Sequence, residues 1–272
     1  METWRLIDSG VADGATNMAT DEALQISCRD GQSPPVLRFY GWNPPTLSLG
    51  FFQKANKEVD LEEVERLRIH LVRRPTGGRA VLHHQELTYS LIIPEDHPLM
   101  PRTVTDSYRI ISSGLLEGFH LLGIPAELSG ETTIRARDFR SPACFEAPSS
   151  YELVVEGKKI VGSAQVRKDG VLLQHGSIML DLDAGMLIRL LRVRDSRTAE
   201  RMRQLLLEKA TSIREVAGTV PGYGELTDAF TRGFENALGV NLSSSELTLQ
   251  ELEDTERLRK DKYAHPSWTF CR

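Results

Sequence analysis

Three cysteines, Cys28, Cys144 and Cys271, are the candidate nucleophiles of this chain. A free thiol has a pKa near ~8.5 and is only about 3% thiolate at pH 7, so a catalytic cysteine needs an electropositive neighbour. Cys144 lies late in residues 126–150, a polar stretch without periodicity that predicts a long loop. It is either a small buried apolar residue or a catalytic nucleophile. Cys28 lies near a predicted helix end, which favours a structural role, and Cys271 is the second-last residue.

Lys159 is the candidate activator of that thiol, because a nearby ammonium group lowers a thiol pKa. It opens a strand that has the composition of a strand buried on both faces. One face would carry Ile160, Gly162 and Ala164, and the other Lys159, Val161 and Ser163. The alternative is an exposed hairpin residue beside Lys158, since Lys159 follows the Glu156-Gly157 turn closely.

A second candidate site is the glycine turn in Arg73-Arg-Pro-Thr-Gly-Gly-Arg79. Consecutive glycines let backbone N–H groups approach a phosphate or a carbonyl, and the paired arginines favour a ligand over a plain tight turn. No Gly-Lys-Ser/Thr follows at P-loop spacing. His83 and His84 come next, but no Cys, Asp or Glu accompanies them at the spacing of a known metal motif. We therefore expect no metal ion and no cofactor.

Helical periodicity indicates the elements that surround these motifs. Gly123 and Gly239 each follow a predicted helix at the position where a C′ glycine is expected. Thr248-Leu-Gln-Glu251 is a capping box that starts a further helix. The predicted helices cover residues 17–27, 60–69, 103–122, 196–208 and 225–238.

Short β-rich runs lie between these helices, at residues 36–52, 71–78 and 86–93. Residues 151–182 read as a meander with a hairpin turn at Asp169-Gly170. We expect an α+β fold with a mostly antiparallel or mixed β-sheet flanked by helices. It would comprise a catalytic domain over residues 1–243 and a helical C-terminal extension over residues 244–272 packed on it.

Composition limits the possible functions. The 272 residues are 40% hydrophobic and 26% charged, as in ordinary globular domains. A net charge of -5 argues against a general nucleic-acid binder. We find no signal peptide and no run near the ~18 apolar residues of a membrane span. The wide, irregular spacing of three cysteines fits neither a disulfide framework nor a metal site. We expect a cytoplasmic monomer without nucleic-acid or membrane contact.

Together these motifs resemble the biotin/lipoate protein ligase superfamily over nearly the whole chain, and within it the cysteine-type octanoyltransferases called LipM. The resemblance is carried by residues 17–24, 42–53, 73–78, 81–90, 144–149 and 151–165. The chain departs from the family pattern at Arg79, where many relatives have a third glycine, and at His84, where relatives often have Asp. Neither position belongs to the acyl chemistry.

The resemblance implies transfer of octanoyl from octanoyl-acyl carrier protein to the lipoyl-domain lysine of the glycine cleavage H protein. Cys144 would carry the acyl thioester, Lys159 would lower its pKa, and neither ATP nor a cofactor would be needed. Tyr40, Trp42 and Leu49 would line an acyl tunnel or be ordinary core. The implied substrate-binding residues are Arg73, Arg74, Thr76, Gly77, Gly78, His83, Gly162, Ser163, Ala164, Gln165, His175 and Gly176.

An arginine-rich stretch has two interpretations. It is either the solvated face of a helix or a docking surface for carrier domains, which are acidic in the pathway of this family. Its members are Arg189, Arg192, Arg194, Arg197, Arg201 and Arg203.

Three alternative functions remain. One is transfer of octanoyl from the H protein to other lipoyl domains, by enzymes whose glycine motif typically lacks the Arg-Arg-Pro-Thr start found here. The second is an ATP-dependent lipoate ligase, which needs no nucleophilic cysteine. The third is a non-catalytic carrier-binding module or repressor, although the first strand begins within a few residues of Met1 and leaves no room for a DNA-binding segment.

Overall fold

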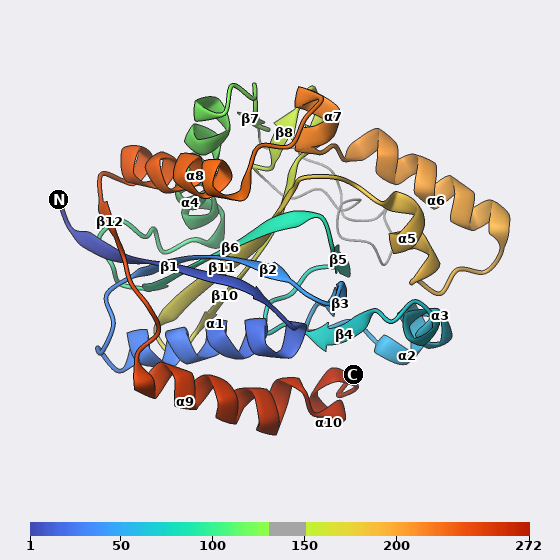
Figure 1. Cartoon of the computed structure of the whole chain (residues 1–272), viewed down its shortest axis with the longest axis horizontal. Coiled ribbons are helices and arrows are strands. Elements are labelled where there is room, and N and C mark those ends of the chain that lie inside the picture. Colours follow the sequence, from blue (N-terminus) through green and yellow to red (C-terminus); the bar gives the residue numbers. More distant parts are fainter. Residues whose placement is uncertain (131–150) are drawn as a thin grey trace.

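The computed structural model describes residues 1–130 and 151–272, so Cys144 and its motif lie outside the described residues. A six-stranded sheet in the order β10-β11-β6-β2-β1-β12 forms the centre of this part of the chain (Figure 1). Its strands are β1 (Thr3–Ala12), β2 (Val36–Trp42), β6 (Glu86–Pro94), β10 (Val161–Lys168), β11 (Val171–Met179) and β12 (Asn241–Ser244).

The large sheet is mixed. β1 runs parallel to both β2 and β12, whereas β6 is antiparallel to β2 and to β11, and β11 is antiparallel to β10. Helices cover both faces, with α4 and α8 on one and α1 and α9 on the other (Figure 1). The α+β prediction is therefore confirmed. These helices are α1 (Gly14–Arg29), α4 (Val104–Leu121), α8 (Tyr223–Leu238) and α9 (Leu249–Leu258).

Two three-stranded sheets complete the β-structure of the described ranges. The main hydrophobic core lies between the large sheet and helices α4 and α8. The first small sheet, in the order β4-β3-β5, packs its apolar side chains with those of α5 (Ala184–Arg189) and α6 (Ser196–Lys209) in a second core. The second has the order β7-β8-β9. Their strands are β3 (Thr46–Leu49), β4 (His70–Arg73), β5 (Val81–His83), β7 (Glu127–Leu128), β8 (Leu153–Val155) and β9 (Lys158–Lys159).

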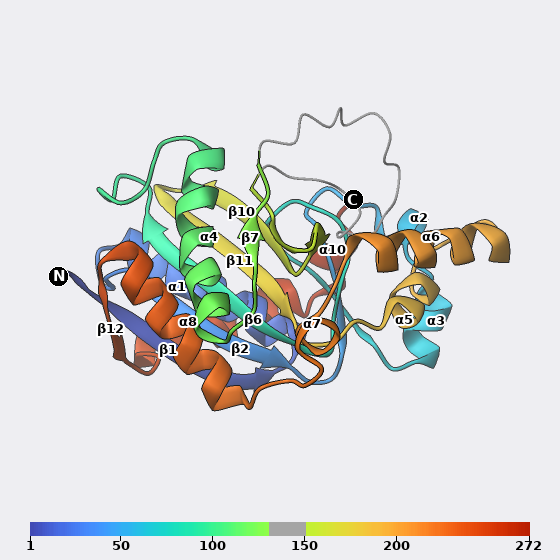
Figure 2. The same ribbon diagram turned by 90° about the horizontal axis from the view of Figure 1, so that it is seen from above.

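Short helices fill the end of the molecule at which α5 and α6 lie side by side (Figure 2). At the C-terminus, α9 and η2 pack along α1, and α10 contacts β4, while a boundary at residue 243 stays a prediction. These elements are α2 (Ala55–Glu58), α3 (Leu61–Arg66), α5 (Ala184–Arg189), α6 (Ser196–Lys209), α7 (Ile213–Ala217), the π-helical turn η2 (Arg259–Tyr263) and α10 (Pro266–Thr269). No helix within the described ranges is long and apolar enough to cross a bilayer.

The local signals of the sequence are confirmed. Gly123 and Gly239 have positive φ angles of 72° and 65° just after α4 and α8, and Thr248 and Glu251 form the capping box of α9. The meander over residues 151–182 is wrong in one respect, because its first strands join the small sheet. The chain changes sheets at Ile160, whose N–H donates to Leu153 of β8 while its carbonyl accepts from Met179 of β11.

Candidate functional site

Polar side chains form rows across the sheet face that α1 covers. Residues paired across neighbouring strands point to the same face. One row runs through Ala164, His175, Ser90 and Arg38, and the next through Gly162, Ser177, Thr88 and Tyr40. The register of four strands therefore collects residues that are far apart in the sequence.

A partly open cavity lies over these rows, between α1 and the small sheet that contains β3 and β5. Met18 of α1 and Val81 of β5 form apolar parts of its wall. Tyr40 and Trp42 line the cavity and also belong to a hydrophobic core cluster with α1, so their place in an acyl tunnel stays a prediction. Leu49 instead packs in the second core. The predicted substrate-binding residues that line the cavity are Arg74, His83, Gly162, Ser163, Ala164, His175 and Gly176.

Gly176 is required where β11 passes the cavity. A Cβ atom at this position would lie 2.4 Å from the Ser163 hydroxyl and 2.7 Å from the Tyr89 ring. These two side chains hydrogen-bond to each other at 2.8 Å. The predicted residue Gln165 does not line the cavity, and its amide donates to Gln174 at 3.0 Å.

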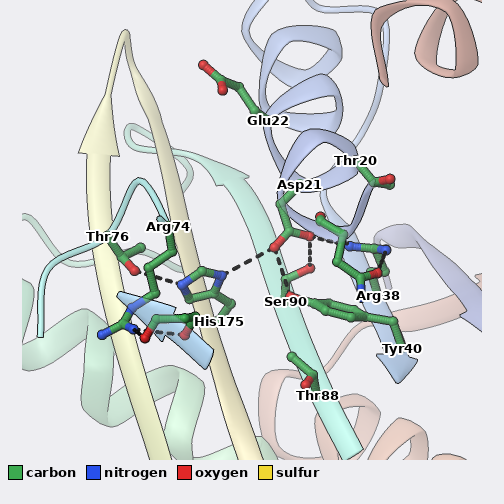
Figure 3. A network of polar contacts seen from close by, with 12 residues as sticks. Thr20, Asp21, Glu22, Arg38, Tyr40, Arg74, Thr76, Thr88, Ser90 and His175 are labelled. Atoms are coloured by element: carbon green, nitrogen blue, oxygen red, sulfur yellow. Dashed lines mark hydrogen bonds and ion pairs between the residues drawn. The ribbon is translucent and has the colours of Figure 1, made fainter. Parts of the chain in front are cut away.

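A buried network links α1 to the glycine turn (Figure 3). Asp21 accepts from Arg38 at 2.7 Å and from the Tyr40 hydroxyl at 3.0 Å. Nδ1 of His175 lies 3.3 Å from Asp21, and its Nε2 lies 2.7 Å from the Thr76 hydroxyl. Thr76 thus meets the cavity indirectly, through His175.

The charge states follow from this packing. Burial raises the pKa of Asp21, but the charge of Arg38 and the contact with His175 outweigh it, so the pKa lies below its ordinary value. Burial lowers the pKa of His175 despite the nearby carboxylate. His175 is therefore neutral at pH 7, with Nδ1–H donating to Asp21 and Nε2 accepting from Thr76.

His83 is held on the cavity wall by contacts on every side. Its ring stacks on Trp42 with centroids 3.9 Å apart. Its Nε2 lies 2.7 Å from the Ser48 hydroxyl, and its Nδ1 lies 2.7 Å from the Glu86 carboxylate. The Thr88 hydroxyl also donates to Glu86.

The glycine turn packs tightly against the end of β3. Gly78 has a positive φ of 91°, and a Cβ at Gly50 would lie 2.1 Å from its carbonyl oxygen. The guanidinium of Arg74 crosses the turn, donating to the carbonyls of Gly77 at 2.9 Å and Arg79 at 2.6 Å. Gly77 and Gly78 themselves are outside the cavity lining, so their substrate contact stays a prediction.

Arg73 points away from the cavity, contrary to what its place in the motif suggested. Its fully buried guanidinium donates to the carbonyls of Gly50 at 2.9 Å, Gln53 at 2.8 Å and Thr269 at 2.7 Å. In return the Trp268 indole donates to the Arg73 carbonyl at 2.9 Å. Arg73 therefore fastens the start of the glycine turn to the C-terminal segment.

Lys159 is only 5% exposed, which rules out the exposed-hairpin alternative. Its ammonium lies 2.7 Å from the Glu152 carboxylate in a buried ion pair. Its carbonyl accepts from Thr211, just after α6. The neighbouring Lys158 instead pairs with Glu215 near the surface.

The other two cysteines, Cys28 and Cys271, differ in burial. Cys28 is buried, and this burial raises the pKa of its thiol to about 11. Cys271 is exposed. Within the described ranges, no group of three or more His, Cys, Asp or Glu side chains could hold a metal ion.

Sequence reasoning missed several residues of this site, among them Met18, Asp21, Ser48 and Glu86. A usable signal was present in β6, where Glu86, Thr88 and Ser90 alternate with Leu87, Tyr89 and Leu91. Alternation of this kind places the polar set on one face of a strand. Because both faces of β6 are covered by helices, that polar face had to be part of a buried site.

Comparisons with known proteins all point to enzymes that attach lipoyl or octanoyl groups to proteins. The family model of the lipoyl protein ligase A/B catalytic domain matches residues 13–235. An octanoyltransferase LipM from Anoxybacillus flavithermus is 52% identical, covering 100% of this chain and 99% of the relative. One from Geobacillus kaustophilus is 51% identical with the same coverage. A solved structure described as a bi-partite lipoate protein ligase and its E2 lipoyl domain from Thermoplasma acidophilum is 25% identical, with a TM-score of 0.83, over 99% of this chain and 97% of that chain.

Proposed function

We propose that this chain, which belongs to the LipM octanoyltransferases of the lipoyl protein ligase A/B family, moves octanoyl from octanoyl-acyl carrier protein to the glycine cleavage H protein. That it is an acyltransferase of lipoylation follows from the family. The donor, the acceptor and a Cys144 thioester are the proposal. Its main structural support is the convergence of residues from β2, β5, β10, β11 and the glycine turn on one largely apolar cavity.

The first step is thioester exchange. The Cys144 thiolate attacks the octanoyl carbonyl, the bond to the phosphopantetheine sulfur breaks, and the leaving thiolate takes the proton that Cys144 gave up. Lys159 favours the thiolate through its positive charge. The burial of Lys159 supports this role, because charges that are removed from water interact more strongly.

The second step makes the amide. The lipoyl-domain lysine arrives protonated, loses one proton, and attacks the octanoyl-cysteine as a neutral amine. It gives its second proton to Cys144, which leaves as the thiol. Since thioester cleavage by an amine runs downhill, no nucleotide is consumed. Backbone N–H groups near Gly77-Gly78 and along Gly162–Ala164 are the proposed donors to the acyl oxygen.

The arginines of α6 and the segment before it are the proposed docking surface for these acidic carriers. Arg189 and Arg203 pair with Glu63 and Glu200. Arg192 and Arg197 are exposed and have no ion pair with a carboxylate in the described part of the chain. The far end of α6 adjoins β9, where Ala210 bridges to Lys159, so a carrier held along α6 would lie near that lysine.

Intact-mass spectrometry after mixing with octanoyl-acyl carrier protein tests the proposal. We expect a hydroxylamine-labile octanoyl adduct on the wild-type chain that is absent from Cys144→Ser. Lys159→Ala should form the adduct slowly while keeping its fold, whereas Lys158→Ala serves as the matched control with normal rates.

Several outcomes would contradict the proposed function. An adduct on Cys28 would refute the site, and wild-type acylation by Lys159→Ala would remove the role of that lysine. Adding H protein without ATP should yield octanoyl-H protein. A strict ATP requirement with full activity in Cys144→Ser would instead indicate a ligase, and transfer only from octanoyl-H protein would indicate the sister amidotransferase.

A further inference from the structure

Ser48 of β3 and His83 of β5 line the cavity, and Glu86 of β6, which is outside the cavity lining, completes a continuous hydrogen-bonded line with them. We propose that they are the proton acceptor for the incoming lysine amine. Ser48 receives the amine proton, His83 stores it, and Glu86 stabilises the resulting imidazolium. This inference rests on the proposed function and adds to it the residues that remove the proton.

The reaction requires such a group only in its second half. Thioester exchange converts one thiol and one thioester into another pair, so no proton is released overall. Amide formation starts from a protonated lysine and ends with an amide, a cysteine thiol and one additional proton. Of the two protons that the nitrogen loses, one restores the Cys144 thiol and the other must leave. A side chain on the cavity wall that accepts this proton would speed the attack.

The hydrogen-bond directions are fixed by a neighbouring arginine. Arg74 can only donate, and its Nη1 lies 3.0 Å from the Ser48 oxygen. The Ser48 proton therefore points to Nε2 of His83, 2.7 Å away. That leaves the His83 proton on Nδ1, donating to Glu86 at 2.7 Å. Nε2 is thus the basic nitrogen, and it faces Ser48 on the cavity wall.

Glu86 is held ready to stabilise a positive charge on His83. Its side chain is only 4% exposed. The hydroxyls of Thr88 and Ser177 donate to it, and the Trp42 indole donates to Thr88 at 2.7 Å, which directs the Thr88 proton to the carboxylate. Glu86 therefore accepts three hydrogen bonds, from His83, Thr88 and Ser177.

The proton then follows a balanced path. The amine N–H bond breaks as its proton moves to the Ser48 oxygen, while the Ser48 proton moves to Nε2 of His83. The imidazolium keeps its Nδ1–H bond to Glu86, in the way that a carboxylate supports histidine in a Ser-His-Asp triad. When the amide product leaves, His83 returns the proton to water through Ser48, and the three groups regain their starting states.

The test compares two nucleophiles on the same octanoyl-enzyme. Lysine reacts after losing a proton, whereas hydroxylamine is a much weaker base and is already neutral at pH 7. In Glu86→Gln we expect transfer to the lipoyl-domain lysine to slow at least about tenfold. Acylation by octanoyl-acyl carrier protein and cleavage by hydroxylamine should stay within about twofold of wild type. Glu95→Gln, the same change just beyond the other end of β6, should leave all three rates unchanged.

Ser48→Ala provides a second variant that alters little volume and should show the same selective loss. Equal losses with both nucleophiles in these variants would indicate a structural role and overturn the proposal, as would wild-type lysine transfer in either one. If the wild-type chain forms no octanoyl adduct at all, the proposed function fails instead, and the two failures are thereby distinguished.

Discussion

Replacing Arg73 with Met should destabilise the protein without a specific effect on substrate binding. Met is of similar length and keeps much of the packing, but it has no donor for the carbonyls of Gly50, Gln53 and Thr269. A buried acceptor that loses its donor costs about 1–3 kcal/mol, and the Gly50 carbonyl keeps one donor, the Gln53 N–H at 3.0 Å. Partial relaxation of the C-terminal segment reduces the sum, so we expect a loss of about 3–5 kcal/mol in the free energy of unfolding.

Thermal and urea unfolding monitored by circular dichroism measure this loss. For chains of about this size, 1 kcal/mol corresponds to roughly 2–4 °C in Tm, so Tm should fall by about 6–20 °C. Arg66→Met is the control, because Arg66 makes an exposed ion pair with Glu63. A surface pair of this kind contributes about 0–1 kcal/mol.

The same variant separates the two roles considered for Arg73. If the residue binds the donor, its loss should raise KM for octanoyl-acyl carrier protein while Tm stays within about 2 °C of wild type. That result would refute the interpretation of Arg73 as a fastening between the glycine turn and the C-terminal segment. A large fall in Tm with unchanged KM below the transition would support it.

Two further predictions concern the turn and the docking surface. Gly50→Ala should lower Tm and slow acyl transfer, because its Cβ would lie 2.1 Å from the Gly78 carbonyl and overpacking costs about 1–3 kcal/mol. Gly224→Ala is the control, because its Cβ meets nothing within 4 Å. It should leave the rate unchanged and Tm unchanged or slightly raised. Reversing charge at Arg192 and Arg197 to Glu should lower the second-order rate with acyl carrier protein at low salt and have less effect at high salt; an unchanged low-salt rate would exclude docking there.

The elements predicted best from sequence are those whose signals are local. The capping box of α9 and the glycines after α4 and α8 depend on contacts within a few residues, so their types and spacing suffice. Strand membership was harder to predict. Residues 151–182 have the alternation and the turns of a single meander, yet the chain leaves one sheet for another at Ile160. That choice depends on β7 and β11, which lie elsewhere in the sequence.

The same distinction applies to the site. The resemblance implied the cavity residues Arg74, His83 and His175. Asp21 and Glu86 lie within its motifs but were not assigned to the site, because their partners are on other elements. An arginine before two glycines suggests an anion as its partner, and substrate contact by Arg73 stays a prediction. Its actual partners are carbonyl groups, one of them 196 residues away in the sequence. Local sequence does not distinguish a guanidinium that binds ligand from one that fastens backbone.

Arg73 and Arg74 both hold the glycine turn in place, each through different backbone carbonyls. This arrangement explains why Arg79 can stand where many relatives have a third glycine. Arg74 needs only the backbone of residue 79, whose carbonyl accepts its Nη2 at 2.6 Å. The Arg79 side chain extends toward Glu58, 3.7 Å away near the surface, and the residue is not among those with positive φ. A Cβ there is therefore not strained. With Arg73 fastening one side of the turn and Arg74 crossing it, the loop is positioned before substrate arrives, which is the condition for its amides to stabilise an acyl oxygen.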